Sequence, residues 1–331
     1  PGSADQLAVG VREVRVRLNV FDVTEVCIPS HRFTCDFFIE VSWEDPALEV
    51  DCSASYSVED WEQQFPYVYS PDSHHWTPRL RFGNIVELGV HEKWVKVYDK
   101  HEDGRSKLPC PVVCYRMRAV GTFREQFELH RFPYDSQDLQ IDFLSAHALS
   151  TQGGPGTSAQ PDHISTAPSD LVSTEIKLVK NIAAKYNAVV PADKFLLSDE
   201  YKIWPGIGER QWHTMATSSG TRKQYPALTL SLKIARRPAF YFLNVILPMF
   251  VFAALGFPCL LLEASDLNGR LSVTYTLLVA VVGYKTWIND SLPRCSYATD
   301  LDHYVLLCFS VIAFFALEST VVFLLQKNHM L

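Results

Sequence analysis

The sequence predicts a multidomain membrane protein: an antiparallel β-sandwich followed by a bundle of transmembrane α-helices. Apolar and polar residues alternate along the first two thirds of the chain, and long uncharged runs fill the last third. Alternation is typical of strands with one buried and one wet face, whereas about 20 consecutive apolar residues suffice to cross a bilayer. We therefore expect two domains, at residues 1–235 and 236–331.

The alternation is clearest in three segments of the first domain, at 14–20, 139–143 and 228–234. In the last of these, aliphatic residues alternate with Thr229, Ser231 and Lys233. Many such segments in succession, with no long helical pattern among them, indicate strands of an antiparallel sandwich.

The second domain holds three apolar segments, for which we expect helices at about 238–262, 269–292 and 300–326. The first has no charged residue, while the second and third are interrupted only by Lys285 and Glu318. One such segment could be a buried core helix, but three in succession with short polar connectors indicate membrane helices. The distribution of Lys and Arg does not decide their orientation.

The middle helix has a polar face. Helical spacing of three and four residues places one row of small or polar residues along it: Ser272, Thr276, Val279, Gly283, Thr286 and Asp290. A helix surrounded by lipid has no reason to keep such a row, so it faces either close-packed helices or water. Asp290 at its end and Thr276 within it favour a water-filled pore.

Composition and motifs argue against several function classes. The net charge of −7 is unsuited to nucleic-acid binding, which requires an excess of Lys and Arg. No P-loop, dinucleotide fingerprint or G-x-S-x-G is present, and the adjacent His74 and His75 would point to opposite faces of a strand. We expect no enzyme, cofactor or metal. The cysteines match no zinc spacing and are either a disulfide framework or mainly buried packing residues.

Several motifs, in order along the chain, resemble those of the Cys-loop receptor superfamily of pentameric ligand-gated ion channels. The segment Phe132-Pro133-Tyr134-Asp135, followed by Gln137, is similar to the FPFDxQ core of the family's signature loop. The others are Trp43-Glu44-Asp45-Pro46, Trp76-Thr77-Pro78 at binding loop A, Tyr225-Pro226 at loop C, Arg236-Arg237-Pro238, and the prolines Pro248 and Pro293. The resemblance covers nearly the whole chain and is specific because all of the motifs are in register.

Two departures from the family pattern stand out. The two loop cysteines would fall at Glu125 and Leu139, so the defining disulfide is missing. This is a feature of bacterial members, which the run 270–299 also resembles more closely than it resembles animal receptors. The family has a fourth membrane helix, which is expected to be removed, unresolved or lost in this chain.

The resemblance implies one subunit of a homo- or hetero-pentamer in the plasma membrane, with its N-terminal domain outside the cell. Its partners would be like subunits, membrane lipid, permeant ions and a small-molecule ligand that opens a pore lined by the second helix. A ligand-binding subunit that does not conduct is the alternative, and a membrane-anchored enzyme is a weaker one.

The resemblance also implies a ligand site between neighbouring subunits. Position by position, Phe82 belongs to loop A, Phe38 to the complementary face, and Tyr225 to loop C, which also holds Trp212. The usual aromatic residue of loop B is replaced by Ala146, beside His147. Because an aromatic cage holds a cation through its ring faces, this loss favours a bulkier or more apolar ligand over a quaternary amine. Core packing is the alternative role of Phe38 and Phe82.

Ligand binding must be coupled to the helices. We expect the loop Phe132–Asp135 to press on the linker Leu292–Thr299, with Pro133 and Pro293 stiffening the two sides. Arg236 is expected to pair with Asp135 or Glu25. The alternative role of Asp135 is to cap a turn.

The polar face of the middle helix would then surround the pore axis. Val279 is its only fully apolar branched residue and is the expected gate, because a closed pore needs an apolar zone that water leaves. Trp287 is the rival constriction. A ring of Asp290 at the outer mouth predicts weak cation selectivity.

Overall fold

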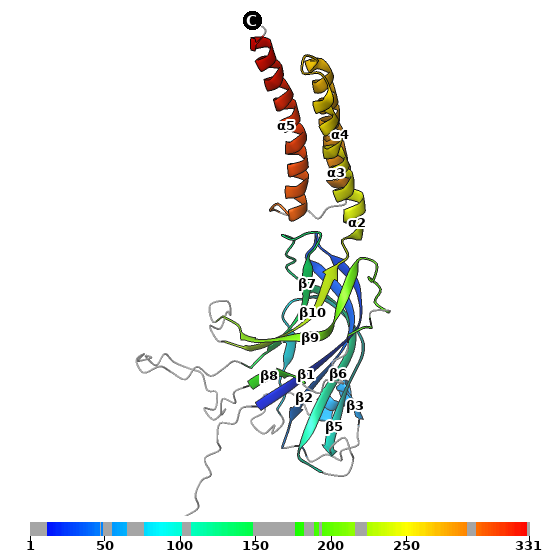
Figure 1. Cartoon of the computed structure of the whole chain (residues 1–331). Helices are drawn as coiled ribbons and strands as arrows, with labels where there is room; N and C mark the ends of the chain where they lie inside the picture. The colour runs from blue at the N-terminus through cyan, green and yellow to red at the C-terminus, as the bar shows by residue number, and fades with distance from the viewer. Residues whose placement is uncertain are drawn as a thin grey trace, which may run out of the picture.

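The computed structural model describes residues 12–46, 48, 55–64, 76–100, 107–147, 176–181, 189–191, 194–215, 224–289 and 296–329. In this part of the chain, two layers of strands form one end of the molecule and apolar helices form the other (Figure 1). The strands β7 and β10 reach the end of the sandwich nearest to the helices, and α5 extends away from the strands toward the C-terminus (Figure 1).

The larger sheet has six strands among the described residues, in the order β3-β5-β6-β2-β1-β8. Their bounds are β1 Arg12–Cys27, β2 Arg32–Glu44, β3 Ser55–Ser57, β5 Ile85–Lys100, β6 Lys107–Arg124 and β8 Ile176–Lys180. Neighbouring strands are antiparallel except for β1 and β8, which are parallel. A short helix, α1 Val58–Gln64, follows β3.

The smaller sheet has four described strands in the order β4-β7-β10-β9. They are β4 Leu80–Phe82, β7 Ser136–Ser145, β9 Tyr201–His213 and β10 Pro226–Arg236, all antiparallel. Along β7, Leu139, Ile141 and Phe143 are buried while Gln140 and Asp142 are only half-buried. The alternation therefore works as predicted, and the antiparallel β-sandwich is confirmed.

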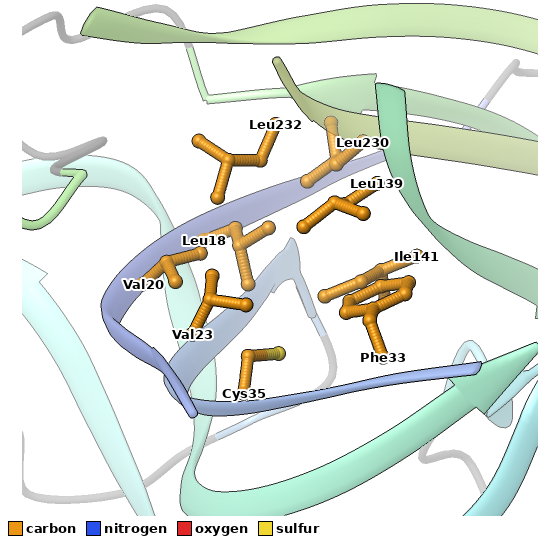
Figure 2. A pocket seen from close by; sticks show the side chains of 9 residues that line it. All are labelled: Leu18, Val20, Val23, Phe33, Cys35, Leu139, Ile141, Leu230 and Leu232. Atoms are coloured by element: carbon orange, nitrogen blue, oxygen red, sulfur yellow. The ribbon is translucent and has the colours of Figure 1, made fainter. Parts of the chain in front are cut away.

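The apolar faces of the two sheets meet in one core. Figure 2 shows side chains of β1, β2, β7 and β10 pointing toward one another around a cavity of about 10 Å³. Every lining residue is apolar or a cysteine: Leu18, Val20, Val23, Phe33, Cys35, Leu139, Ile141, Leu230 and Leu232. A water needs two to four polar partners, so this is a dry packing gap and not a ligand site.

The described residues include three helical spans long and apolar enough to cross a membrane, of 23, 22 and 29 residues. They are Ala239–Leu261, Leu267–Ile288 and Asp300–Asn328. The second lies within α4 Leu267–Asn289 and the third within α5 Asp300–His329. Many of their large apolar side chains are exposed, as suits contact with lipid.

The first span is not one regular α-helix, unlike the continuous helix expected from its composition. It consists of α2 Ala239–Tyr241, a π-helical turn η2 Phe242–Ile246, α3 Leu247–Ala254 and a 3₁₀ turn η3 Phe257–Leu261. Pro248 and Pro258 account for these changes because proline supplies no N–H and clashes with the preceding turn.

The cysteines within the described ranges are free thiols: Cys27, Cys35, Cys110, Cys114, Cys259 and Cys308. Cys35, Cys114, Cys259 and Cys308 are buried. Burial raises the pKa of Cys114 to about 12, which keeps it a neutral packing residue. Cys52 and Cys295 lie outside the described residues.

Candidate functional site

Phe38 lies on the face of β2 that points away from the core, between the buried Phe37 and Ile39. Its ring centroid is 5.9 Å from that of Trp94 on β5. The guanidinium carbon of Arg17 on β1 stands 5.6 Å from the Phe38 ring centroid, within cation–π range. Three strands thus present aromatic and cationic groups on one outer surface.

Charged residues extend this surface along β2 and β6. Arg116 donates from Nε to Glu40 Oε2 at 2.5 Å and from a terminal nitrogen to the Tyr98 hydroxyl at 2.9 Å. Arg17 lies 4.0 Å from the same Glu40 carboxylate. Burial, the largest single effect, lowers the pKa of Arg116, but the charge of Glu40, its hydrogen bond and the nearby Tyr98 together raise that pKa. The guanidinium of Arg116 stays charged and is held in place by Glu40 and Tyr98.

Phe82 occupies a different place. Its ring contacts those of Phe37, Phe123 and Phe143 at centroid distances of 5.8, 5.6 and 5.3 Å. Core packing, the alternative role of Phe82, accounts for these contacts. The ring also lines a pocket of about 550 Å³ between the sheets, with Trp43 among the other lining residues.

The neighbours of loop B form a stacked cluster. His147 lies over Trp76 with ring centroids 5.5 Å apart, and its Nε2 is 2.7 Å from the Thr77 carbonyl oxygen. The guanidinium of Arg12 lies 4.8 Å from the centroid of the Trp76 ring on which His147 stacks. His147 is therefore held within its own subunit by residues that precede β4.

Trp212 and Tyr225 lie where β9 and β10 approach their connecting loop. Trp212 Nε1 donates to Thr229 Oγ1 at 2.9 Å, and that hydroxyl donates to Asp142 Oδ1 at 2.6 Å. The Tyr225 backbone N–H donates to Thr214 Oγ1 at 2.9 Å. These bonds fix the two strands while leaving both rings only half-buried.

The expected ligand-site residues do not converge within one chain. Phe38 belongs to the outer surface of the six-stranded sheet, whereas Trp212 belongs to β9 of the four-stranded sheet and Tyr225 directly precedes β10. A site that uses both groups requires two copies of the chain.

Arg236, the predicted coupling residue at the end of β10, pairs with Asp135. Arg236 Nε donates to Asp135 Oδ1 at 2.8 Å, and the two side chains are 6% and 2% exposed. Gln137 Nε2 donates to Asp135 Oδ2 at 2.8 Å. Of the two acids expected to pair with Arg236, the structure places Asp135 against it, while Glu25 is exposed.

Arg236 also stands over two aromatic rings. Its guanidinium carbon is 4.9 Å from the Tyr201 ring centroid and 5.1 Å from that of Phe132. Burial would lower the pKa of Arg236, but the bond to Asp135 and nearby negative charge raise it. The pair is thus a fixed ionic contact where the sandwich meets the first span.

The loop before β7 packs into the helical bundle. Leu129 and Phe132 are 2% and 1% exposed and share a hydrophobic cluster with Met249, Val281 and Leu301. The Phe132 ring meets Tyr241 edge-on at 4.7 Å, and the Phe132–Pro133 peptide bond is cis.

Hydrogen bonds join the same loop to the start of α5. The Tyr297 hydroxyl accepts the Leu129 N–H at 2.9 Å, and its ring stacks on His130 at 4.1 Å. The N–H groups of Asp300 and Leu301 donate to carbonyls of this loop at 2.9 and 3.2 Å. Tyr297 of the 292–299 linker therefore contacts the loop at Leu129 and His130, which precede the expected segment Phe132–Asp135. Pro293 lies outside the described residues.

On α4, the row of small and polar residues faces away from the other helices. Ser272, Thr276, Val279, Gly283 and Thr286 are all exposed, with Val279 at 73%. Asp290 lies outside the described residues. The opposite face, with Thr274, Val281 and Ile288, is buried against the bundle. One chain therefore leaves this row open to a partner, lipid or water.

Glu125 is the residue at which the resemblance to the receptor family would place the first loop cysteine. Its carboxylate accepts the N–H of Gln140 at 2.8 Å and of Gln126 at 3.1 Å. Burial raises its pKa to about 7, and the nearby Asp138 and Asp142 add to the shift. Nothing in the sequence pattern distinguished this glutamate from a surface one.

Sequence reasoning also missed Arg17, Arg116, Tyr201 and Tyr297. The two arginines occupy outward positions of alternating strands, a signal that could have placed them on the same outer surface as Phe38. Tyr201 and Tyr297 carry no comparable signal, because their partners are far away along the chain.

The chain is similar to a receptor subunit. A Caenorhabditis elegans protein described as gamma-aminobutyric acid receptor subunit beta is 21% identical to it over 283 residues. That match covers 84% of this chain and 41% of the relative, so the chain spans about two fifths of the relative's length. No protein-family model matches the chain. The likeness agrees with the Cys-loop receptor-like architecture of a β-sandwich followed by apolar spans. The closer likeness to bacterial members stays a prediction.

Proposed function

We propose that this chain is one subunit of a pentameric ligand-gated ion channel in the plasma membrane, with the β-sandwich outside the cell. One observation carries the proposal: the loop 125–135 is built into both halves of the molecule. It extends into the sandwich through β7, and its Leu129 and Phe132 are core residues of the helical bundle. A shift of the sandwich must then move the helices, as gating by a ligand requires.

The proposed ligand site lies between two subunits. One would contribute Phe38 with Arg17 and Trp94, and the other Tyr225 and Trp212. Gamma-aminobutyric acid is the first compound to test, since the relative's description names it. Its carboxylate would suit the positive charge of Arg17, and its small size contrasts with the bulkier apolar ligand that the sequence favours. A panel of both kinds decides between them.

The proposed pore is lined by five copies of α4. Val279 is the proposed gate, because it is the apolar branched member of the exposed row and dewetting of an apolar ring closes a pore. The proposed ring of Asp290 would concentrate cations at the outer mouth. Reversal potentials in a salt gradient test this: a shift toward the chloride potential contradicts cation selectivity.

The deciding experiment combines subunit counting with current recording. The chain purified in mild detergent should be a pentamer by native mass spectrometry. In planar bilayers, one compound of the panel should evoke current. Ligand binding to a pentamer without any current would indicate a non-conducting receptor, and a monomer would contradict the proposal.

A further inference from the structure

The first membrane span has an irregular turn at Phe242–Pro248, called the kink below, which leaves one backbone carbonyl without its α-helical partner. Pro248 has no N–H, so the carbonyl of Asn244, four residues earlier, receives no α-helical hydrogen bond from it. The π-helical turn Phe242–Ile246 lies immediately before this point. An unbonded carbonyl is costly in an apolar bilayer, where no water replaces the missing donor.

Two tyrosine hydroxyls from the other two spans meet this kink. Tyr284 of α4 donates to the Asn244 carbonyl oxygen. Tyr304 of α5 donates to the Ile246 carbonyl oxygen at 2.9 Å. The amide of Asn244 is itself engaged, donating to the Phe240 carbonyl at 2.9 Å. The Asn244 and Ile246 carbonyls thus accept hydrogen bonds from outside the first span.

Tyr284 is well placed to control α4. It follows Gly283 of the exposed row, and its ring contacts Phe252 of the first span at 5.6 Å and Trp287 at 5.7 Å. Rotating or tilting α4 against the first span would separate the hydroxyl from its carbonyl. The bond therefore resists movement of the helix that carries Val279.

We propose that Tyr284 and Tyr304 are positioning residues, whose hydroxyls bind the kink carbonyls and so hold α4 and α5 against the first span. The effect on gating rests on the proposed channel function, whereas the effect on the bundle does not. Interhelical hydrogen bonds in membranes are modest, so losing each hydroxyl should change the relevant equilibrium by about threefold.

The first test measures the bundle without requiring current. Y284F and Y304F remove one hydroxyl each and should lower the melting temperature of the assembled protein in detergent. Y275F is the matched control, because Tyr275 lies on α4 and is 55% exposed. Melting temperatures of Y284F and Y304F equal to that of Y275F would overturn the proposal.

A double-mutant cycle tests the mechanism. P248A supplies the missing N–H to the Asn244 carbonyl, so Y284F should lose most of its effect in that background. Y304F should keep its effect, because its acceptor is Ile246. An equal effect of Y284F in both backgrounds contradicts the inference. If P248A fails to assemble, the comparison of Y284F with Y275F decides.

The second test uses currents. Y284F should change the half-activating ligand concentration by about threefold, whereas Y275F should leave it unchanged. A hydrogen bond with a purely structural role would not produce the shift expected in Y284F. Current with an unchanged half-activating concentration overturns the role in gating. Absence of any current from the natural sequence contradicts the proposed function, while the melting data still test the hydrogen bonds.

Discussion

Replacing Asp135 with alanine should damage the junction between the sandwich and the helices. The carboxylate accepts bonds from Arg236 and Gln137, and both members of the ion pair are nearly fully buried. The variant would leave a guanidinium buried without a counter-charge. Removing one partner of a buried ion pair costs about 3–5 kcal/mol. D135A should therefore fail to assemble, or unfold well below the melting temperature of the natural chain.

Replacing Arg236, the partner of Asp135, with an uncharged residue tests the same prediction more directly. R236M keeps an unbranched apolar chain over the Phe132 and Tyr201 rings and removes the buried cation. The double variant D135A/R236M should therefore be more stable than D135A alone, with a coupling of about 1–3 kcal/mol in a double-mutant cycle. Melting in detergent and surface labelling of expressing cells provide the measurements.

The control is E25A, because Glu25 is exposed and was the other acid considered for Arg236. It should change stability by less than about 0.5 kcal/mol. If D135A matched E25A in melting temperature, assembly and gating, the reasoning about the buried pair would be refuted. A double variant as unstable as the sum of its two single variants would refute the pairwise coupling.

Three further predictions concern the pocket, the pore and pH. F82A should destabilise the sandwich by less than the roughly 3–5 kcal/mol lost with a fully buried phenylalanine, because Phe82 is only partly buried. F38A and Y225A should leave the assembly intact and weaken ligand response by about 1–2 kcal/mol. Unchanged potency in both would move the ligand elsewhere, for instance to the pocket that Phe82 lines. V279S should add leak current, and an unchanged closed state would move the gate to Trp287. Because burial raises the pKa of Glu125 to about 7, the folded state holds a proton on this carboxyl that the unfolded state loses, so stability should fall as pH rises from 4.5 to 7. E125Q should flatten this part of a profile of melting temperature against pH. A slope identical to that of the natural chain would contradict the prediction.

Much of the architecture could be predicted because it depends on local patterns. The alternation at 139–143 and 228–234 specifies strands with one buried face, and these segments pair as β7 and β10. The charge-free run after Pro238 specifies a membrane span through its composition alone. The irregular geometry of that span was not predicted, although Pro248 and Pro258 stand in it, and the tyrosine hydroxyls that donate to its carbonyls come from other helices.

In the candidate site, too, some features follow from local patterns and others depend on tertiary contacts. The exposed row of α4 and the outward position of Phe38 follow from helical and strand periodicity, which a linear sequence contains. The packing of the partly buried Phe82 against three aromatic rings depends on side chains from β2, β6 and β7, so its neighbours could not be known from β4 alone.

Periodicity and composition are local properties, and they account for the sandwich, the three spans and the polar row. Pairing partners are not local. Asp135 and Arg236 are 101 positions apart, and Leu129 and Tyr297 are 168 apart. Tyr284 and Asn244 lie on different helices. Chain folding brings these groups within hydrogen-bond distance, because burial removes water and leaves each polar group to find a partner within the protein.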